Sequence, residues 1–531
     1  MSAFQQGDRA MAERKHSSRV PASLSNAQGI RRRELLRGGS ALLFGAAAPV
    51  NAGESKAKNA EAFAERSYSL HAGWALVAID RDLKPVLQRD VHVLVRDGRI
   101  EAIRNRPFRE SLEHLDLRGD LLLPGFISGH THCCSATPTR GIIEGGRSYA
   151  RPLELVETLA DDELDALTSL NLAELLRSGC TTQLEMSLSL RQAESYVRVA
   201  ERMGARGYPG SMIPAIDRLF PIWFRADDKV LADSERETLE EIERNLEFGR
   251  RNMDRADGLL KPMMSPHACD THTPATMRAI AAAARELGTG LHIHLSQGAR
   301  ETATVRRMHG MTPTQWMESL GVLQVGPVFG AHMTGLDWSV DPAILRRHGV
   351  VYAHCPSAGG AGGATQPLPE ALGEQLSVNV GIDTHSNDFL ENLKLAVLFG
   401  QARHALLKDR DESLPIVAPT IDGMVDASTR LPARALGRDD IGVLREGAQG
   451  DLVSVDVTGL LGGAGSLPPE PMNNLLYANG RMVRTVMTSG RLQVRDGEFL
   501  ADNVRRVVDE GGEVAQKIWS RLEEENWFQT N

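Results

Sequence analysis

The sequence predicts an α/β protein that combines a (β/α)₈ TIM-like barrel with a small β-sandwich domain. Between about 124 and 435, short apolar runs alternate with helical stretches, as at 161–179 and 276–288. This alternation implies a parallel sheet covered by helices on both faces, and a barrel is the economical arrangement at this length. Short strands of alternating polarity occupy 68–123 and 436–500, so we expect these two flanks to pair into one discontinuous domain.

The two chain ends predict separate elements. Three consecutive arginines at 31–33 precede a weakly hydrophobic run at 41–50, and small residues at 50–52 resemble a cleavage site. This pattern is typical of a twin-arginine signal, so we expect residues 1–52 to direct export to the periplasm. The alternative is a basic tail on a cytoplasmic protein. Residues 501–531 are expected to form a C-terminal helical tail.

Composition excludes several classes of protein. The net charge is −9 over 531 residues, and no basic stripe lies outside the N-terminus, which argues against nucleic acid as a partner. No stretch of about 20 apolar residues predicts a membrane span. Five cysteines without a C-x-x-C pair do not make a disulfide framework, and we expect Cys133 and Cys134 to be small buried residues. The expected partners are a small-molecule substrate and a second copy of the chain, in a dimer.

Histidines recur where the predicted barrel strands end. In a parallel barrel all these ends open onto one face, so their side chains should converge. Alternate residues of a strand point to the same side, and His130 and His132 can therefore bind one ion together. Another imidazole and a carboxylate would complete a site with a position open for water. The strand-end residues are His130, His132, His267, His292, His294, His332 and Asp383.

The order of these motifs, together with "LLLPGFISGHTH", resembles the amidohydrolase superfamily. The most similar branch holds cytosine, guanine and S-adenosylhomocysteine deaminases and the triazine hydrolases, and the resemblance spans nearly all of 68–500. It implies metal ligation by His130, His132, His294 and Asp383, with His292 lying deeper. It also implies that Asp383 takes a proton from the metal-bound water, that His332 orients or polarises the attacked group, and that His267 contacts substrate.

Two departures from this branch bear on the substrate. Deaminases of the branch carry Glu three residues after the ligand of strand five, where this chain has Gln297. An amide cannot carry a proton to a ring nitrogen, which favours an amide, urea or carbamate substrate. The usual Asn is missing from the glycine-rich segment 354–363. His385 and Asn387 could face substrate, but a capping turn before the next helix explains them equally well.

The leading hypothesis is therefore a metal-dependent hydrolase that attacks a C–N bond of a small amide, urea or carbamate through a metal-bound hydroxide. One alternative is a hydrolytic deaminase or dechlorinase of an N-heteroaromatic ring. Another is a non-catalytic protein that only holds the metal. Lys261 lies near the start of strand four, too early to bridge two ions, so we expect one divalent ion, zinc or alternatively iron.

Overall fold

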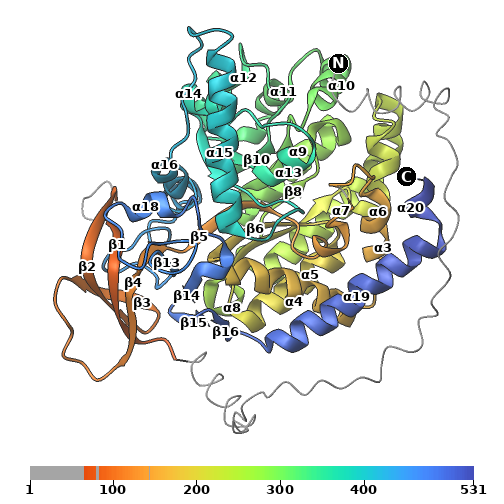
Figure 1. The fold of residues 1–531 in the computed structure, drawn as a ribbon. Helices are drawn as coiled ribbons and strands as arrows, with labels where there is room; N and C mark the ends of the chain where they lie inside the picture. The colour runs from red at the N-terminus through yellow and green to blue at the C-terminus, as the bar shows by residue number, and fades with distance from the viewer. Residues whose placement is uncertain (1–64, 79–82, 143, 531) are drawn as a thin grey trace, which may run out of the picture. The chain divides into compact units, whose positions relative to one another are not determined.

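A computed structural model describes residues 65–78, 83–142 and 144–530 (Figure 1). The predicted export signal at 1–52 lies outside these residues. Eight parallel strands form the barrel as two four-stranded sheets, in the orders β5-β6-β7-β8 and β12-β11-β10-β9. Parallel bridges between Met264 and Leu291, and between Thr131 and Asp383, join the two sheets, so the predicted barrel fold is confirmed. The strands are β5 (Phe126–Thr131), β6 (Cys180–Ser187), β7 (Arg206–Ile213), β8 (Ser265–Pro266), β9 (Leu291–Leu295), β10 (Val328–His332), β11 (Val351–His354) and β12 (Ser377–Val380).

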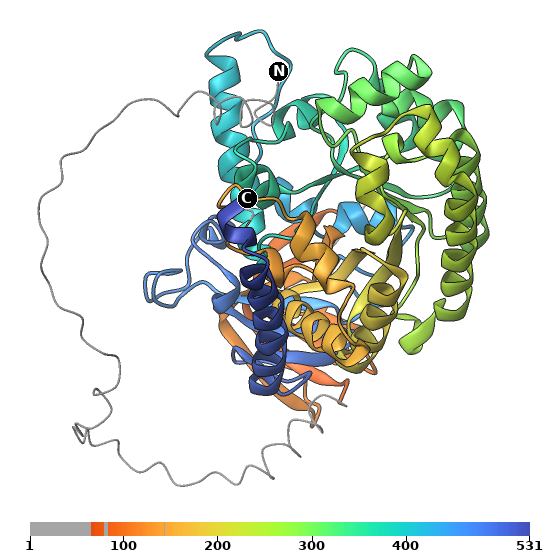
Figure 2. The same ribbon diagram turned by 90° about the vertical axis from the view of Figure 1, so that its right-hand side faces the viewer.

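Helices between the strands cover the outside of the barrel (Figure 2). Their ends carry ordinary start and stop signals. In α9, Thr273 accepts a hydrogen bond from the Thr276 backbone at 3.2 Å, and Gly288 ends the helix with φ of 71°. The helices are α3 (Ala150–Val156), α4 (Asp161–Arg177), α5 (Leu190–Met203), α6 (Ile216–Trp223), α7 (Asp228–Asn252), α8 (Arg255–Gly258), α9 (Pro274–Leu287), α10 (Ala299–His309), α11 (Pro313–Ser319), α12 (Asp341–His348), α13 (Pro356–Ala361), α14 (Leu368–Gly373), α15 (Phe389–Lys408), α16 (Ile421–Asp426) and α17 (Arg430–Ala435).

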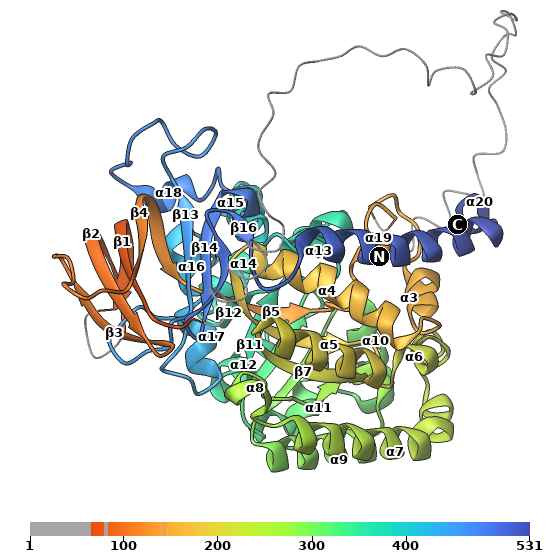
Figure 3. The same cartoon turned by 90° about the horizontal axis from the view of Figure 1, so that it is seen from below.

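The flanking strands form one sheet in the order β16-β15-β14-β13-β4-β1-β2-β3. Both halves of this sheet contribute to a single core, in which Leu70 and Val93 pack with Leu452 and Met487. The two flanks meet where β4 pairs with β13, and β4 leads through Gly125 into the first barrel strand (Figure 3). The strands are β1 (Tyr68–Ala78), β2 (Pro85–Arg96), β3 (Arg99–Arg104), β4 (Glu113–Pro124), β13 (Leu452–Asp456), β14 (Val483–Thr488), β15 (Arg491–Arg495) and β16 (Glu498–Phe499).

The C-terminal segment is helical and packs on the barrel. Helix α18 (Pro471–Asn474) precedes the last strands, and α19 (Val504–Glu524) and α20 (Trp527–Thr530) end the chain. Ile518 and Leu522 of α19 share a core with Leu164 of α4, and Lys517 pairs with Glu163 at 2.7 Å. No helix within 65–78, 83–142 or 144–530 is long and apolar enough to cross a membrane.

Candidate metal centre

Four of the predicted strand-end side chains converge on one point. The Nε2 atoms of His132 and His294 lie 3.4 Å apart, although their strands are distant in sequence. Asp383 Oδ1 lies 3.6 Å from His132 Nε2 and 4.0 Å from His130 Nε2. Tetrahedral ligands at about 2.05 Å from one zinc ion would be roughly 3.3 Å apart, close to the shortest of these spacings. Donor atoms of His130, His132 and Asp383 lie within 4.8 Å of one another, as do those of His130, His294 and His332.

The far side of each imidazole is held by a second hydrogen bond. The Nδ1–H groups of His132 and His294 donate to the carbonyl oxygens of Met186 and His267, at 2.6 and 2.9 Å. His130 Nδ1 lies 2.7 Å from Nε2 of His292. The two bonds to carbonyl oxygens fix the tautomer of His132 and His294 that leaves Nε2 free to bind metal. Between His130 and His292 either nitrogen can be the donor.

Burial supports the same reading. His130, His132 and His294 are buried, and burial holds the pKa of each below its usual value, which favours the neutral, ligating form. His130 Nε2 is buried without a hydrogen-bond partner among the described residues, as is His332 Nε2. Buried polar atoms are normally paired, so two buried nitrogens without a hydrogen-bond partner suit the binding of a cation. The donor set therefore supports a metal cofactor.

The backbone is strained where two of these residues leave their strands. His332 has φ of 76° and Asp383 has φ of 65°, in the left-handed region that side chains other than glycine rarely adopt. Such residues cost about 1–3 kcal/mol each and concentrate at functional sites. His332 Nε2 lies 3.7 Å from Asp383 Oδ2, so the two face each other across the centre.

A further predicted residue, His267, lies beside the metal centre. His267 follows β8, its ring centroid is 5.2 Å from that of His294, and burial lowers its pKa to about 3. The imidazole is therefore neutral and can exchange hydrogen bonds with a substrate. Trp223 of α6 contacts His267 edge-on at 5.2 Å, and the Arg300 guanidinium lies over the indole. The sequence analysis did not predict that Trp223 and Arg300 lie beside His267. The aromatic run at 220–224 was the available signal.

Gln297 lies in the loop after β9 and is half-buried. Its backbone N–H donates to Glu301 Oε2 at 2.6 Å, and Glu301 Oε1 accepts from the Cys269 backbone at 3.2 Å. Glu301 thus ties the Gln297 loop to the loop that follows His267. Burial raises the pKa of this carboxyl to about 8. No sequence signal singled Glu301 out, because both partners are backbone groups and one of them, at Cys269, is 32 residues away.

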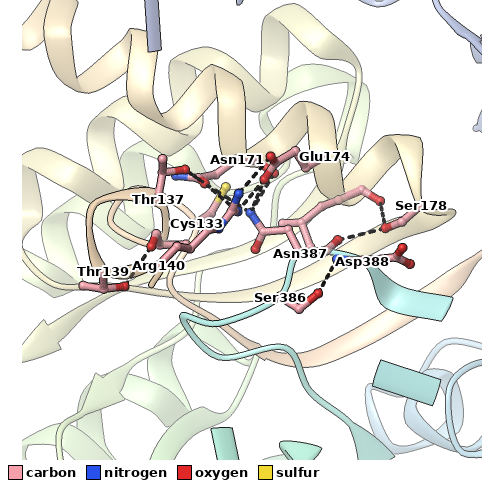
Figure 4. A network of polar contacts seen from close by, with 12 residues as sticks. Cys133, Thr137, Thr139, Arg140, Asn171, Glu174, Ser178, Ser386, Asn387 and Asp388 are labelled. Atoms are coloured by element: carbon pink, nitrogen blue, oxygen red, sulfur yellow. Dashed lines mark hydrogen bonds and ion pairs between the residues drawn. The ribbon is translucent and has the colours of Figure 1, made fainter. Parts of the chain in front are cut away.

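His385 and Asn387 have different surroundings. A pocket of about 700 Å³ opens between α4, α13 and α15, and His385 lines it with both ring nitrogens buried and without a described partner. Asn387 instead donates to Asn171 Oδ1 and Glu174 Oε2 of α4, at 3.1 and 2.9 Å (Figure 4). Asn387 therefore anchors the loop, and His385 remains the residue that can meet a ligand.

The adjacent cysteines stay away from the donor set. Cys133 and Cys134 are buried in the barrel core, and burial raises the pKa of both thiols. Cys355, which sequence reasoning did not single out, lies within 4.8 Å of donor atoms of His332 and Asp383. Burial raises the pKa of its thiol too, which keeps it protonated and a poor ligand. Lys261, which we did not expect to bridge two ions, forms an ion pair with Asp254.

Comparisons with known proteins identify the family. The sequence model described as "Amidohydrolase family" matches residues 121–492. The 5-methylthioadenosine/S-adenosylhomocysteine deaminase of Desulfitobacterium hafniense is 27% identical over 75% of this chain and 86% of its own length. The 5'-deoxyadenosine deaminase of Methanosarcina mazei is 25% identical over 81% and 94%.

Solved structures share the fold. An adenosine deaminase from Xanthomonas campestris with bound zinc superposes with a TM-score of 0.70 at 22% identity, covering 85% of this chain and 98% of that one. An atrazine chlorohydrolase from Arthrobacter aurescens in complex with zinc gives 0.70 at 19% identity, covering 84% and 100%. The family match, the barrel and the strand-end donors confirm the predicted relationship: this chain belongs to the amidohydrolase family and is a hydrolase of carbon–nitrogen bonds.

Proposed function

We propose that this enzyme hydrolyses the C–N bond of a small amide, urea or carbamate. The observation that carries the proposal is a convergent set of donors together with an amide, Gln297, in the loop directly after the His294 strand, where related ring deaminases hold a carboxylate. His130, His132, His294 and Asp383 would hold one divalent ion, which acts as a Lewis acid and activates water at neutral pH. We assign zinc, with iron as the alternative.

Different side chains of the protein would then carry out the separate steps of the reaction. Asp383 is the base that takes a proton from the attacking water and passes it to the leaving nitrogen. His332, which faces Asp383, orients and polarises the attacked carbon's oxygen. His267 and Gln297 hydrogen-bond the substrate on the opposite side, and His385 contacts the part of it that enters the pocket.

A second function, hydrolytic deamination or dechlorination of an N-heteroaromatic ring, is favoured by the relatives named as adenosine-type deaminases. It would require a proton donor other than Gln297 for the ring nitrogen. A third function, a non-catalytic protein that only holds the metal, would not explain why His332 faces Asp383.

Product analysis separates these functions. The metal-loaded protein is incubated with simple amides, aryl and alkyl ureas, carbamates, adenosine-type nucleosides and chlorotriazines, and the released ammonia, amine, alcohol or chloride is measured. We expect amine or ammonia from the acyclic substrates. Efficient ammonia release from the rings would overturn the amide, urea or carbamate assignment, and so would the absence of turnover of every acyclic substrate.

Gln297→Glu tests the residue on which the choice rests. General acid–base catalysis contributes about 10²–10⁴-fold, so an effect on ring substrates should be visible in steady-state rates. We expect no gain on the acyclic substrate and new, weak ring deamination. Gln516→Glu, on the exposed side of α19, controls for the added charge. A gain of tenfold or more on the acyclic substrate would contradict the proposal.

The metal count is a separate test. We expect one bound ion in the barrel, and Ala at His130, His132, His294 or Asp383 should abolish activity by removing the ion or the base. Two ions in the barrel together with a modified Lys261 would contradict the mononuclear assignment.

We further propose that residues 1–52 direct export by the twin-arginine route, which rests on sequence alone. Replacement of the paired arginines by lysines should then leave the protein in the cytoplasm with its first 52 residues attached. An exported protein that still begins at Met1 would contradict cleavage of the signal.

We also propose a homodimer. Leu460, Leu461 and Tyr477 are 91%, 81% and 69% exposed, and a partner would cover such apolar side chains. Light scattering should give twice the chain mass, and Leu461→Glu should lower it; a monomeric wild-type protein would contradict this proposal.

A further inference from the structure

A second group of metal-binding side chains lies on the flanking sheet, outside the barrel. His71 of β1 and His92 of β2 are direct partners in the antiparallel register. Their rings are stacked, with centroids 3.9 Å apart and planes inclined by 22°. The neighbouring residues Leu70, Val91 and Val93 point into the core of the sheet. Because side chains alternate along a strand, both histidines lie on the opposite, outer face.

Asp90 completes the group. It lies two residues before His92 and therefore on the same side of β2, and its φ of 57° marks a local distortion of the strand. Its Oδ1 is 2.6 Å from Nε2 of His71. One donor atom from each of the three residues lies within 4.8 Å of the other two. The Asp90 and His71 side chains are 69% and 19% exposed while His92 is buried, so an ion could enter from solvent and still contact all three.

The chemistry of this group selects a class of ion. Two imidazoles and one carboxylate suit zinc, nickel or copper, whereas magnesium and calcium prefer oxygen ligands alone. Burial lowers the pKa of His92, which favours its neutral form. Arg89 and Arg104 act on Asp90 and His92 respectively, and these positive charges would weaken cation binding. An ordinary exposed ion pair between His71 and Asp90 would contribute little to stability and would not require the second imidazole.

The geometry points to a second divalent-metal site formed by His71, Asp90 and His92, which takes a transition ion of the zinc, nickel or copper type independently of the catalytic centre.

Metal stoichiometry of the full chain tests this inference. The protein is stripped with a chelator, titrated with Zn²⁺ and analysed for bound metal after dialysis. The wild type should bind two ions, and His71→Ala and Asp90→Asn should each bind one while keeping full hydrolytic activity. His132→Ala should bind one ion at the sheet and be inactive. His114→Ala, which removes an imidazole of the same sheet that lies outside the group, should still bind two.

A spectroscopic readout identifies the ligands independently of activity. In the His132→Ala background, bound Cu²⁺ should give an electron paramagnetic resonance spectrum with splitting from two imidazole nitrogens, lost in His71→Ala. Equal metal content in the wild type and Asp90→Asn would overturn the inference, since Asp90 is exposed and its replacement leaves the fold intact. If only the proposed barrel site were wrong, the result would be different. His71→Ala would then lose bound metal, whereas His132→Ala would bind as much metal as the wild type.

Discussion

Replacing His292 by Phe tests whether His292 orients His130, which we propose as a metal ligand. His292 Nε2 lies 2.7 Å from His130 Nδ1, and both residues are fully buried. With Nε2 of His130 committed to the metal, Nδ1 must carry the proton and donate it to His292. Phe keeps the ring volume and removes this acceptor.

The size of the effect follows from the loss of that single bond. Loss of a partner that orients a metal ligand typically weakens metal affinity by about 10–100-fold. At about 1.4 kcal/mol per tenfold change, this corresponds to roughly 1.4–2.8 kcal/mol. It agrees with the cost of about 1–3 kcal/mol for leaving one buried donor, here the His130 N–H, without an acceptor.

Competition with a chromophoric chelator measures the zinc affinity, and thermal unfolding of both metal-free proteins measures stability. His272→Phe is the matched control, because it removes a buried imidazole that bonds the Ile213 carbonyl at 2.9 Å. We expect the control to lose stability but not zinc affinity. Zinc affinity of His292→Phe within twofold of the wild type would refute the orienting role, and equal losses in both variants would mean general destabilisation.

Two stability predictions follow from other buried groups. Arg206 and Asp451 form a two-bond ion pair between the barrel and the flanking sheet, with side chains 3% and 2% exposed; Asp451→Ala should cost about 3–5 kcal/mol in denaturant unfolding by stranding the guanidinium. Asp161→Ala breaks an exposed pair whose charges are screened by water, so it should cost much less than Asp451→Ala. Equal losses would contradict this reasoning. Burial raises the pKa of Glu301 from 4.5 to about 8. Its contribution is therefore fully present below about pH 4.5 and is lost as the pH rises towards 8, so the stability of Glu301→Gln relative to wild type should improve over that window. A difference that stays constant from pH 5 to pH 8 would contradict a raised pKa.

Much of the catalytic centre could be predicted from local patterns. The spacing of His130 and His132 places two imidazoles on one side of a strand whatever surrounds it. The barrel topology then brings His294, His332 and Asp383 to the same face, since every parallel strand ends there. The roles of His385 and Asn387 could not be separated in this way, because the contacts of Asn387 come from α4, more than two hundred residues earlier.

The sequence by itself therefore determined the fold class, the family and the candidate donors, because these follow from periodicity and from short motifs at the ends of successive strands. The tertiary structure decided what each neighbour does. It placed His292 within 2.7 Å of His130, tied two loops together through Glu301, and stacked His71 on His92. Each of these contacts depends on the register between segments far apart in the chain, and a shift of one residue in strand pairing would remove it.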